Sequence, residues 1–288
     1  MTTEPVDEPR SPDGPPPSTA KIAAADRNHA ITADHYREQA RLFGEDAAST
    51  MQDLTTRQRE MEGIFQTLDW LGAHKEAPRA IVDIGCGNGL LLSLLRQGHL
   101  DIELTGLEYS PELRAIARGR DIADCEIVDG DVRALPFADS RFDVAITERC
   151  IINILDRDEQ EASLREMARI VRPGGYYICI EAFTDGLAQL NEAREQMGLP
   201  HNVMPHFNRW FDPGWFRAVI EGSFDIVADP ALPPTNFLSS HYFVSRVLYP
   251  ASTTAPIVYN SHFARFFDFL EPIGNYSPIQ FWLLRRKG

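Results

Sequence analysis

The sequence predicts an α/β protein whose mostly parallel sheet carries helices on both faces. Two observations predict this fold class: apolar, strand-like runs alternate with helical patterns from residue 80 onwards, and a glycine-rich turn directly follows the first run. Such alternation is typical of parallel sheets, because each crossover back to the next strand covers one face. With 288 residues, 43% of them hydrophobic, the chain is long enough to bury this core in one elaborated domain or in one domain plus a cap, and two full domains are possible but not required.

The segment before the first strand divides into two parts. Residues 1–20 contain six prolines and several acids, so we expect a disordered tail there. Residues 21–78 are expected to form a helical leader, because the pattern is helical from His29 to His74. Apolar residues recur there at three- and four-residue steps, which predicts one apolar face: Met61, Ile64, Phe65, Leu68 and Leu71.

The expected core covers residues 79–288. Ala80 to Ile84 is predicted to be a buried strand, and Leu90 to Leu95 opens the helix after the glycine turn. Ile102 to Leu107 is a second strand, Pro111 marks a helix start, and Asp143 to Ile146 is a further strand after Phe142. Strands and helices therefore alternate as the fold class requires.

The second half of the core continues this pattern and adds two insertions. A helix is expected between Asp158 and Val171, ended by Pro173-Gly174-Gly175 ahead of a strand from Tyr176 to Ile180, and the final strand is Pro278 to Leu284. Residues 184–210, with a helix from Leu187 to Met197 stopped by Gly198, and the aromatic residues 237–276 interrupt the alternation. Both are long enough to cover a functional site.

The run Val82-Asp83-Ile84-Gly85-Cys86-Gly87-Asn88-Gly89 points to a ligand site. Glycines at alternate positions after a strand let the backbone turn sharply and admit a ligand against main-chain atoms. Glu108 ends the second strand, where a carboxylate can accept both hydroxyls of a ribose, and Asp131-Val132 would meet an adenine edge and face. Together these pieces predict a nucleoside pocket.

These motifs, VDIGCGNG, the acid in TGLEYS, GDVRALPFADSRFDVAI and RIVRPGG, resemble those of the class I S-adenosylmethionine-dependent methyltransferases over about residues 80–182. The resemblance implies a Rossmann-like seven-stranded sheet whose last strand is antiparallel. It also implies S-adenosylmethionine as cofactor and S-adenosylhomocysteine as product. The leader, with Tyr36, Phe43 and Ser49-Thr50-Met51, resembles the mobile N-terminal lid of members that act on small molecules.

The resemblance further implies roles for individual residues. Glu108 would bind the ribose, Asp131 the adenine amino group and Val132 the adenine ring, while Asp83 would stabilise the turn near the amino group of the methionine part. The turn glycines Gly85, Gly87 and Gly89 would surround the methionine part. The remaining expected cofactor contacts are Cys86, Tyr109 and Glu148.

Residues for the acceptor are less constrained by the sequence. A base matters only if the acceptor is a hydroxyl, a protonated amine or a carbon acid, and the candidates are Tyr36, Glu148, Glu181 and His206. Each has a structural alternative: an ion pair between Glu148 and Arg149, a loop cap for Glu181, packing or exposure for the other two. Expected substrate contacts are Arg149, Asn208, Arg209 and Tyr276.

Charge and composition exclude several classes of function. A net charge of −14 opposes binding to phosphate-rich partners, so we expect neither a nucleic acid nor a membrane as substrate. The four cysteines lack metal-type spacing and the carboxylates do not cluster, so we predict no metal. Because the cysteines are scattered and the N-terminus lacks a signal pattern, we expect reduced thiols in a cytoplasmic protein. The aromatic second insertion leaves a homodimer open.

The expected function is in-line methyl transfer to a small, natural-product-like acceptor in a closed pocket, as in secondary metabolism. N-, O- and C-methylation all stay open. One alternative is a regulatory protein that binds S-adenosylmethionine without turnover. An NAD-dependent oxidoreductase is the other, but Leu90 occupies the position of the last glycine in the dinucleotide fingerprint.

Overall fold

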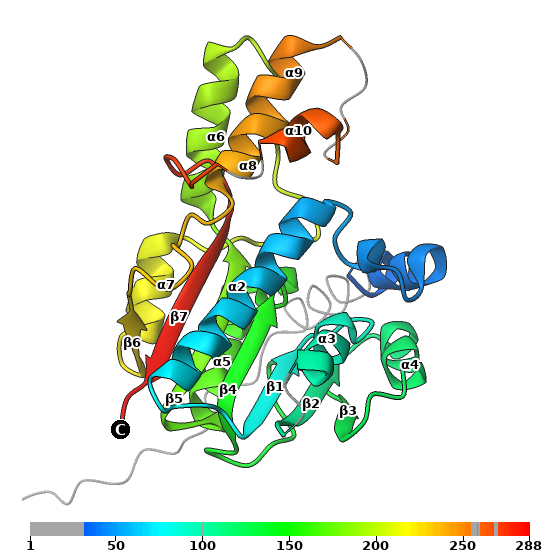
Figure 1. Ribbon diagram of the computed structural model, residues 1–288, viewed down its shortest axis with the longest axis vertical. Coiled ribbons are helices and arrows are strands. Elements are labelled where there is room, and N and C mark those ends of the chain that lie inside the picture. Colours follow the sequence, from blue (N-terminus) through cyan, green and yellow to red (C-terminus); the bar gives the residue numbers. More distant parts are fainter. Residues whose placement is uncertain (1–31, 99–100, 255–257, 259, 268–269) are drawn as a thin grey trace, which may run out of the picture.

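The computed structural model describes residues 32–98, 101–254, 258, 260–267 and 270–288, so the predicted tail at residues 1–20 lies outside the described residues. Seven strands form one sheet in the order β3-β2-β1-β4-β5-β7-β6 (Figure 1). The strands are β1 (Ala80–Ile84), β2 (Glu103–Glu108), β3 (Cys125–Asp129), β4 (Phe142–Glu148), β5 (Val171–Ala182), β6 (Phe224–Val227) and β7 (Ile279–Arg286).

The pairing of these strands confirms the predicted Rossmann-like sheet. β1 to β5 pair in parallel, whereas β7 runs antiparallel to both of its neighbours, β5 and β6. The sequence had indicated five of the strands by residue range. It did not delimit β3 or β6, because both are short and carry exposed or half-buried side chains at several positions.

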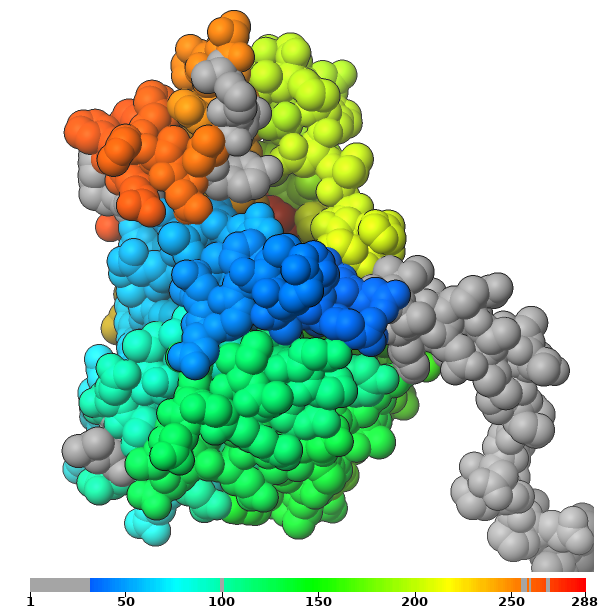
Figure 2. All heavy atoms as spheres, turned by 90° about the vertical axis from the view of Figure 1, so that its right-hand side faces the viewer, coloured from blue at the N-terminus to red at the C-terminus, as the bar shows by residue number. Residues whose placement is uncertain are grey.

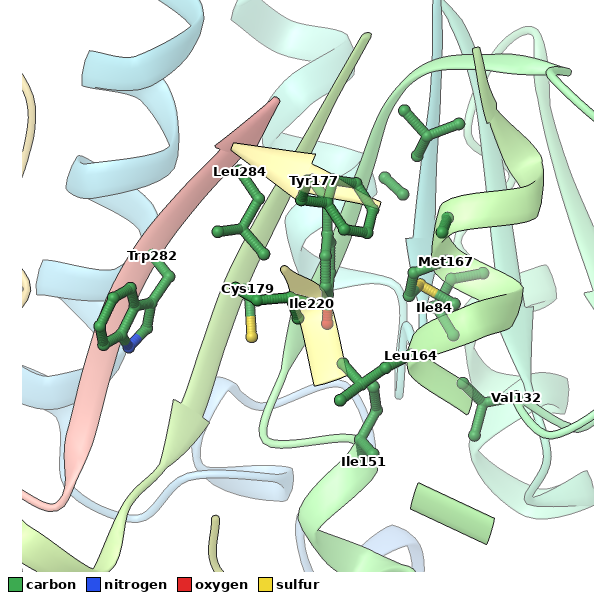
Figure 3. Close-up of a cluster of buried hydrophobic side chains, with 14 of the residues drawn as sticks. Ile84, Val132, Ile151, Leu164, Met167, Tyr177, Cys179, Ile220, Trp282 and Leu284 are labelled. Atoms are coloured by element: carbon green, nitrogen blue, oxygen red, sulfur yellow. The ribbon is translucent and has the colours of Figure 1, made fainter. Parts of the chain in front are cut away.

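Helices bury an apolar core on each face of the sheet. On one face, α2 (Leu54–Ala73) and α3 (Leu90–Gly98) pack against β1, β4 and β5. On the other, α5 (Arg157–Ile170) and α7 (Pro213–Ile220) bury Leu164, Met167 and Ile220 against Tyr177 and Trp282 (Figure 3). α4 (Pro111–Gly119) packs beside β2 and β3. Because both faces are covered, the central strands read as nearly continuous apolar runs.

Local capping explains where the helices begin. Ser110 accepts the backbone N–H of Leu113 and Pro111 occupies the first turn of α4, as the sequence predicts. Asp156 caps α5 and Asp53 caps α2 in the same way. After α6 (Thr184–Gln196), Gly198 adopts a φ of +67°, which confirms it as the expected stop.

The end of α5 differs from the expectation. The helix ends at Ile170, and β5 begins directly at Val171, so Pro173-Gly174-Gly175 lies within the strand instead of separating it from the helix. The physical reason is close backbone packing: a Cβ on Gly175 would lie 2.7 Å from the carbonyl oxygen of Asp143, where the register of β4 and β5 shifts.

The leader consists of separate helices. Residues 32–43 are helical, a 3-10 turn follows at Ala47–Ser49, and α2 starts at Leu54. Figure 2 shows the first of these segments, in blue, lying across the molecule between the sheet domain in green and the yellow-to-orange elements above it. The leader helix therefore lies between these two parts of the molecule.

The two insertions meet to form a single cap at one end of the molecule (Figure 1). The second insertion contributes α8 (Ser239–Phe243), a π-helical segment (Val244–Leu248), α9 (Tyr249–Ser252) and α10 (His262–Phe266). α6 of the first insertion contacts the π-helical segment, where Arg194 donates to the carbonyl oxygen of Arg246. Among the described residues, none of the helices combines the length and the apolar character that crossing a bilayer requires.

A buried charge cluster ties this cap to the leader. The carboxylate of Asp53, at the start of α2, accepts hydrogen bonds from His241 Nε2 at 2.9 Å and from Arg246 at 2.6 Å. Burial would raise the pKa of Asp53, but the hydrogen bond from His241 and the charge of Arg246 outweigh it and hold that pKa well below its usual range. The cap is therefore fixed to the helix that borders the site described next.

Candidate active site

A cavity of about 1120 Å³, which includes space open to solvent, lies at the carboxyl ends of β1, β2 and β4. This is the edge at which ligands bind in open α/β sheets. Residues of the leader close it from above. Ten residues that the sequence predicts for the site line it together: Tyr36, Gly85, Cys86, Gly87, Glu108, Tyr109, Asp131, Val132, Glu148 and Arg149.

The glycine turn adopts the backbone geometry that its sequence predicts. Gly85, Gly87 and Gly89 have φ values of +77°, +56° and +76°, a region that side-chain-bearing residues rarely occupy. A Cβ on Gly85 would lie 2.7 Å from Cys150 Sγ, and one on Gly87 would lie 3.1 Å from Thr50 Cγ2. Gly89 faces Ala117 of α4 and does not line the cavity. The turn lacks side chains because its backbone is left-handed and because Cys150, Thr50 of the leader and Ala117 approach it closely.

Glu108 connects the end of β2 to this turn. Its carboxylate accepts the backbone N–H of Gly87 at 2.8 Å and the backbone N–H of Ser110 at 2.7 Å. Burial raises the pKa of Glu108, while these two N–H groups oppose the rise because they stabilise the ionised form. The carboxylate lines the cavity, and each oxygen keeps lone-pair capacity for a further donor.

Asp131 lines the same side of the cavity and is held by its neighbour Arg133. The Arg133 guanidinium donates to Asp131 through Nε at 2.8 Å, and its backbone N–H donates to the same carboxylate at 2.9 Å. Glu159 accepts from Arg133 at 3.0 Å. The carboxylate therefore has a fixed direction beside Val132.

Two acids and one arginine lie at the other end of the turn. Asp83 is buried beneath it without lining the cavity, and burial together with the nearby charge of Glu148 raises its pKa well above the usual range. Glu148 pairs with Arg57 of α2 at 3.5 Å, a long separation for such a pair. Arg57 also donates to Thr50 Oγ1 at 2.5 Å, and its buried Nε has no partner among the described residues.

Arg149 follows Glu148 in an unusual conformation. Its φ is +54°, which is uncommon for a residue with a side chain and is often found at functional sites. Its guanidinium pairs with the carboxylate of Glu60 on α2, which is completely buried. Burial raises the pKa of Glu60 to about 7, although the charge of Arg149 opposes the rise. Glu148 and Arg149 therefore each pair with α2 and not with each other.

A chain of side-chain hydrogen bonds holds the leader helix against the cavity. The Tyr36 phenol oxygen accepts from Asn153 Nδ2 at 2.9 Å, and Asn153 Oδ1 accepts from Asn208 Nδ2 at 2.7 Å. Beside this chain, His35 stacks on Phe207 with ring centroids 4.2 Å apart. Asn208 thus reaches the site through Asn153, from the first insertion.

Four other candidate residues lie away from the cavity lining. Glu181 accepts the backbone N–H groups of Cys150, Ile151 and Ile152 at 3.0 to 3.3 Å, so it caps the loop after β4. His206 is exposed and packs edge-on against Phe207. The other two are Arg209, which donates to the carbonyl oxygen of Leu155, and Tyr276, which packs on Phe243 in the cap.

The structure adds residues to the site that the sequence did not single out. Arg57 and Asn153 line the cavity, and Glu60 supports Arg149 from behind. One signal for Arg57 and Glu60 was available in the sequence. Arg57 precedes Met61 by four positions and Glu60 precedes Ile64 by four, so both lie on the apolar face of the helix. Charged side chains on the apolar face of a helix indicate buried partners. Asn153 had no comparable signal.

Comparison with known proteins places these motifs in one family of domains. Residues 82–179 match the family model described as "Methyltransferase domain". Over 112 residues the chain is 31% identical to demethylmenaquinone methyltransferase of Thermus thermophilus, covering 38% of this chain and 50% of that protein. It is 34% identical over 121 residues to malonyl-[acyl-carrier protein] O-methyltransferase of Erwinia pyrifoliae, covering 41% and 43%.

The matched relatives do not share one type of acceptor. A probable tRNA methyltransferase 9B of Mus musculus is 36% identical over 95 residues, covering 33% of this chain and 20% of that protein. The chain spans about half the length, or less, of these curated relatives. The crystal structure of PH0226 protein from Pyrococcus horikoshii OT3 resembles the fold with a TM-score of 0.53 at 17% identity, covering 87% and 99% of the two chains.

Proposed function

We propose that this chain, which carries a class I S-adenosylmethionine-dependent methyltransferase domain, transfers a methyl group to a small-molecule acceptor. One observation carries the proposal: the glycine turn, the acid at the end of β2 and the acid after β3 all line a single cavity.

The residues present suit the cofactor that this domain implies. An adenosine would lie between Glu108, for the ribose hydroxyls, and Asp131 with Val132, for the adenine. The methionine part carries an ammonium and a carboxylate. Glu148 and Arg57 both line the cavity at that end as a loose pair at 3.5 Å, so the Arg57 guanidinium can take a ligand carboxylate as a further partner. We therefore propose Arg57 as a cofactor-binding residue.

S-adenosylmethionine, when bound, supplies a methyl group that is already activated by the sulfonium charge. The tasks that fall to the protein are to align the acceptor and to exclude water. Tyr36, docked through Asn153, closes the cavity on the leader side. Glu181 accepts three N–H groups outside the cavity lining and His206 is exposed, so neither supports a role as a general base.

Calorimetry with S-adenosylmethionine and S-adenosylhomocysteine tests cofactor binding, and an assay for S-adenosylhomocysteine release from an acceptor library tests transfer. We expect binding of both compounds and turnover with at least one small molecule. Binding without turnover on any acceptor would favour a regulatory protein. Failure to bind either compound, together with binding of NAD, would favour the oxidoreductase alternative.

The setting of this activity is also part of the proposal. The net charge of −14 supports a small, natural-product-like acceptor over tRNA, and we place the protein in the cytoplasm and in secondary metabolism. Large apolar side chains are exposed on the cap, with Phe266 70% and Ile273 53% accessible, which supports a homodimer through the second insertion. Sedimentation equilibrium tests the dimer, and Phe266→Ser should weaken it.

A further inference from the structure

Hydrogen-bond donors without acceptors gather at the leader end of the cavity. The cofactor described above accounts for the turn glycines and for the acids beside them. Tyr36 and Arg149 also line the cavity but are left without a role in holding the cofactor. They face each other closely enough for the Arg149 charge to lower the pKa of Tyr36 against the larger effect of burial. These two residues therefore border the space left for the acceptor.

The hydrogen bond that the Tyr36 phenol makes with Asn153 does not use the phenol proton. Its oxygen accepts the hydrogen bond from Asn153 Nδ2, so the phenol proton stays available. Among the described residues no atom accepts that proton. Burial raises the pKa of Tyr36, which keeps the phenol protonated and makes it a hydrogen-bond donor instead of a base.

Arg149 offers further donors from the opposite wall. One terminal nitrogen binds Glu60, and within the described part of the chain no other hydrogen bond uses the remaining guanidinium N–H groups. Glu60 and the left-handed backbone fix the direction of this side chain. A planar guanidinium with free N–H groups matches the oxygens of a carboxylate better than any neutral group.

The carboxylates that line the cavity have protein partners, and the proposed function assigns each of them to the cofactor. Glu108 accepts from Gly87 and Ser110, Asp131 accepts from Arg133, and Glu148 pairs with Arg57. A cationic amine acceptor would need a free carboxylate, and a neutral alcohol would need a base to take its proton. Neither is present among the described residues at this end of the cavity, whereas two donors are.

We propose that the acceptor is a carboxylic acid whose carboxylate binds between the Tyr36 phenol and the Arg149 guanidinium, so that the reaction is carboxyl O-methylation. This proposal rests on the proposed function and narrows its substrate class. An ionised carboxylate oxygen is nucleophilic at neutral pH, which explains why the site needs no general base.

The step balances without a proton transfer. One carboxylate oxygen forms a bond to the methyl carbon while the bond between that carbon and sulfur breaks. The electron pair of the broken bond stays on sulfur, which becomes a neutral thioether. The negative charge of the acceptor and the positive charge of the sulfonium disappear together, and a methyl ester is the product.

Binding of simple acids to the protein loaded with S-adenosylhomocysteine tests this proposal. Benzoate and octanoate are compared by calorimetry with benzyl alcohol, octanol, benzylamine and octylamine. We expect the two carboxylates to bind and the alcohols and amines to bind more weakly. With S-adenosylhomocysteine held at saturation, since Tyr36→Phe also loses the hydrogen bond from Asn153 and releases the cofactor faster, this variant should weaken carboxylate binding about tenfold. Tyr249→Phe, which removes a phenol from the cap, is the matched control.

Tyr36→Phe is the decisive variant, because replacing Arg149 also disturbs its ion pair with the buried Glu60. Arg149→Lys, which keeps the charge, is the second variant. Assays with S-adenosylmethionine and the same acids should yield methyl esters, detected by mass spectrometry. Carboxylates that fail to bind, alcohols or amines that bind more tightly, or unchanged affinity in Tyr36→Phe would each overturn the carboxylate assignment. Failure of S-adenosylhomocysteine to bind would instead count against the proposed function.

Discussion

The carboxylate of Glu108 accepts the backbone N–H of Gly87 at 2.8 Å, and this contact joins the end of β2 to the glycine turn. The same side chain accepts the N–H of Ser110, the residue that caps α4. One acid therefore sets the shape of the turn and the start of the next helix, and in the proposed function it also binds a ribose. Its replacement affects structure and binding together.

Glu108→Ala should weaken S-adenosylmethionine binding by about 10- to 100-fold, because the ribose loses acceptors and the turn loses its support. Glu108→Gln should fall between Ala and the wild type, since one amide oxygen can still accept. Calorimetry measures both. Glu103→Gln, at the exposed opposite end of β2, is the control and should leave the affinity unchanged. Equal affinity in Glu108→Ala and wild type would refute the ribose assignment.

Gly87→Ala should lower both stability and cofactor affinity. The new Cβ would lie 3.1 Å from Thr50 Cγ2, and the φ of +56° adds strain of about 1–2 kcal/mol. The double variant Gly87→Ala, Thr50→Ser removes the opposing methyl group and keeps the hydroxyl that Arg57 uses, so it should recover part of the loss.

Gly198→Ala separates the two causes in this prediction. Gly198 has a similar φ of +67°, but a Cβ added there would have no atom within 4 Å, so the substitution contributes backbone strain alone. Urea unfolding gives the stability of each variant, and calorimetry gives the affinity. If Gly87→Ala costs no more than Gly198→Ala and binds the cofactor normally, the contact with the leader does not matter.

The sequence predicts the first half of the site well because that half depends on local backbone. A strand, three glycines and a helix in immediate succession determine the turn from Gly85 to Gly89, and Glu108 follows from the end of the next strand. Where Pro173-Gly174-Gly175 is concerned, the same local reasoning was wrong. The strand β5 tolerates these residues because β4 shifts its register beside them.

The second half of the site could not be predicted because it depends on which elements meet. Arg57 and Glu60 belong to α2, yet their partners Glu148 and Arg149 lie at the end of β4 and directly after it, about 90 residues later. Glu181 was a candidate base by its position at a strand end, but the three N–H groups it accepts belong to a loop whose path no local pattern reveals.

Asn153→Ala should accelerate dissociation of the cofactor about tenfold. The variant loses the hydrogen bond to Tyr36, which holds the leader helix over the cavity. It also loses those to Asn208 and to the carbonyl oxygen of Arg149, which orient the Asn153 side chain. Stopped-flow binding measures the rate, and hydrogen exchange should rise over residues 32–43.

Asn191→Ala is the matched control for this prediction, since Asn191 bridges the backbone of Asn202 in the first insertion and lies away from the cavity. It should lose some stability without changing the dissociation rate. Equal rates in Asn153→Ala and wild type, with unchanged exchange over residues 32–43, would show that the hydrogen-bond chain does not retain the leader.

Glu181 should make the stability of the protein depend on pH. Burial raises the pKa of this carboxyl to about 7 from its ordinary value of 4.5, although its three N–H donors oppose the rise. Between these two pH values the folded protein binds more protons than the unfolded chain, so the contribution of Glu181 to stability is lost as the pH rises from 4.5 to 7.

Glu181→Gln removes this titration and should therefore destabilise the protein more at pH 5 than at pH 8, with a difference of about 1–3 kcal/mol. Comparing variant with wild type at each pH cancels the titration of other groups, including Glu60, whose pKa is also raised to about 7. Urea unfolding at the two pH values gives the difference directly. The same destabilisation at both would mean that Glu181 is already ionised below pH 5, because its three N–H donors would then outweigh the cost of its burial.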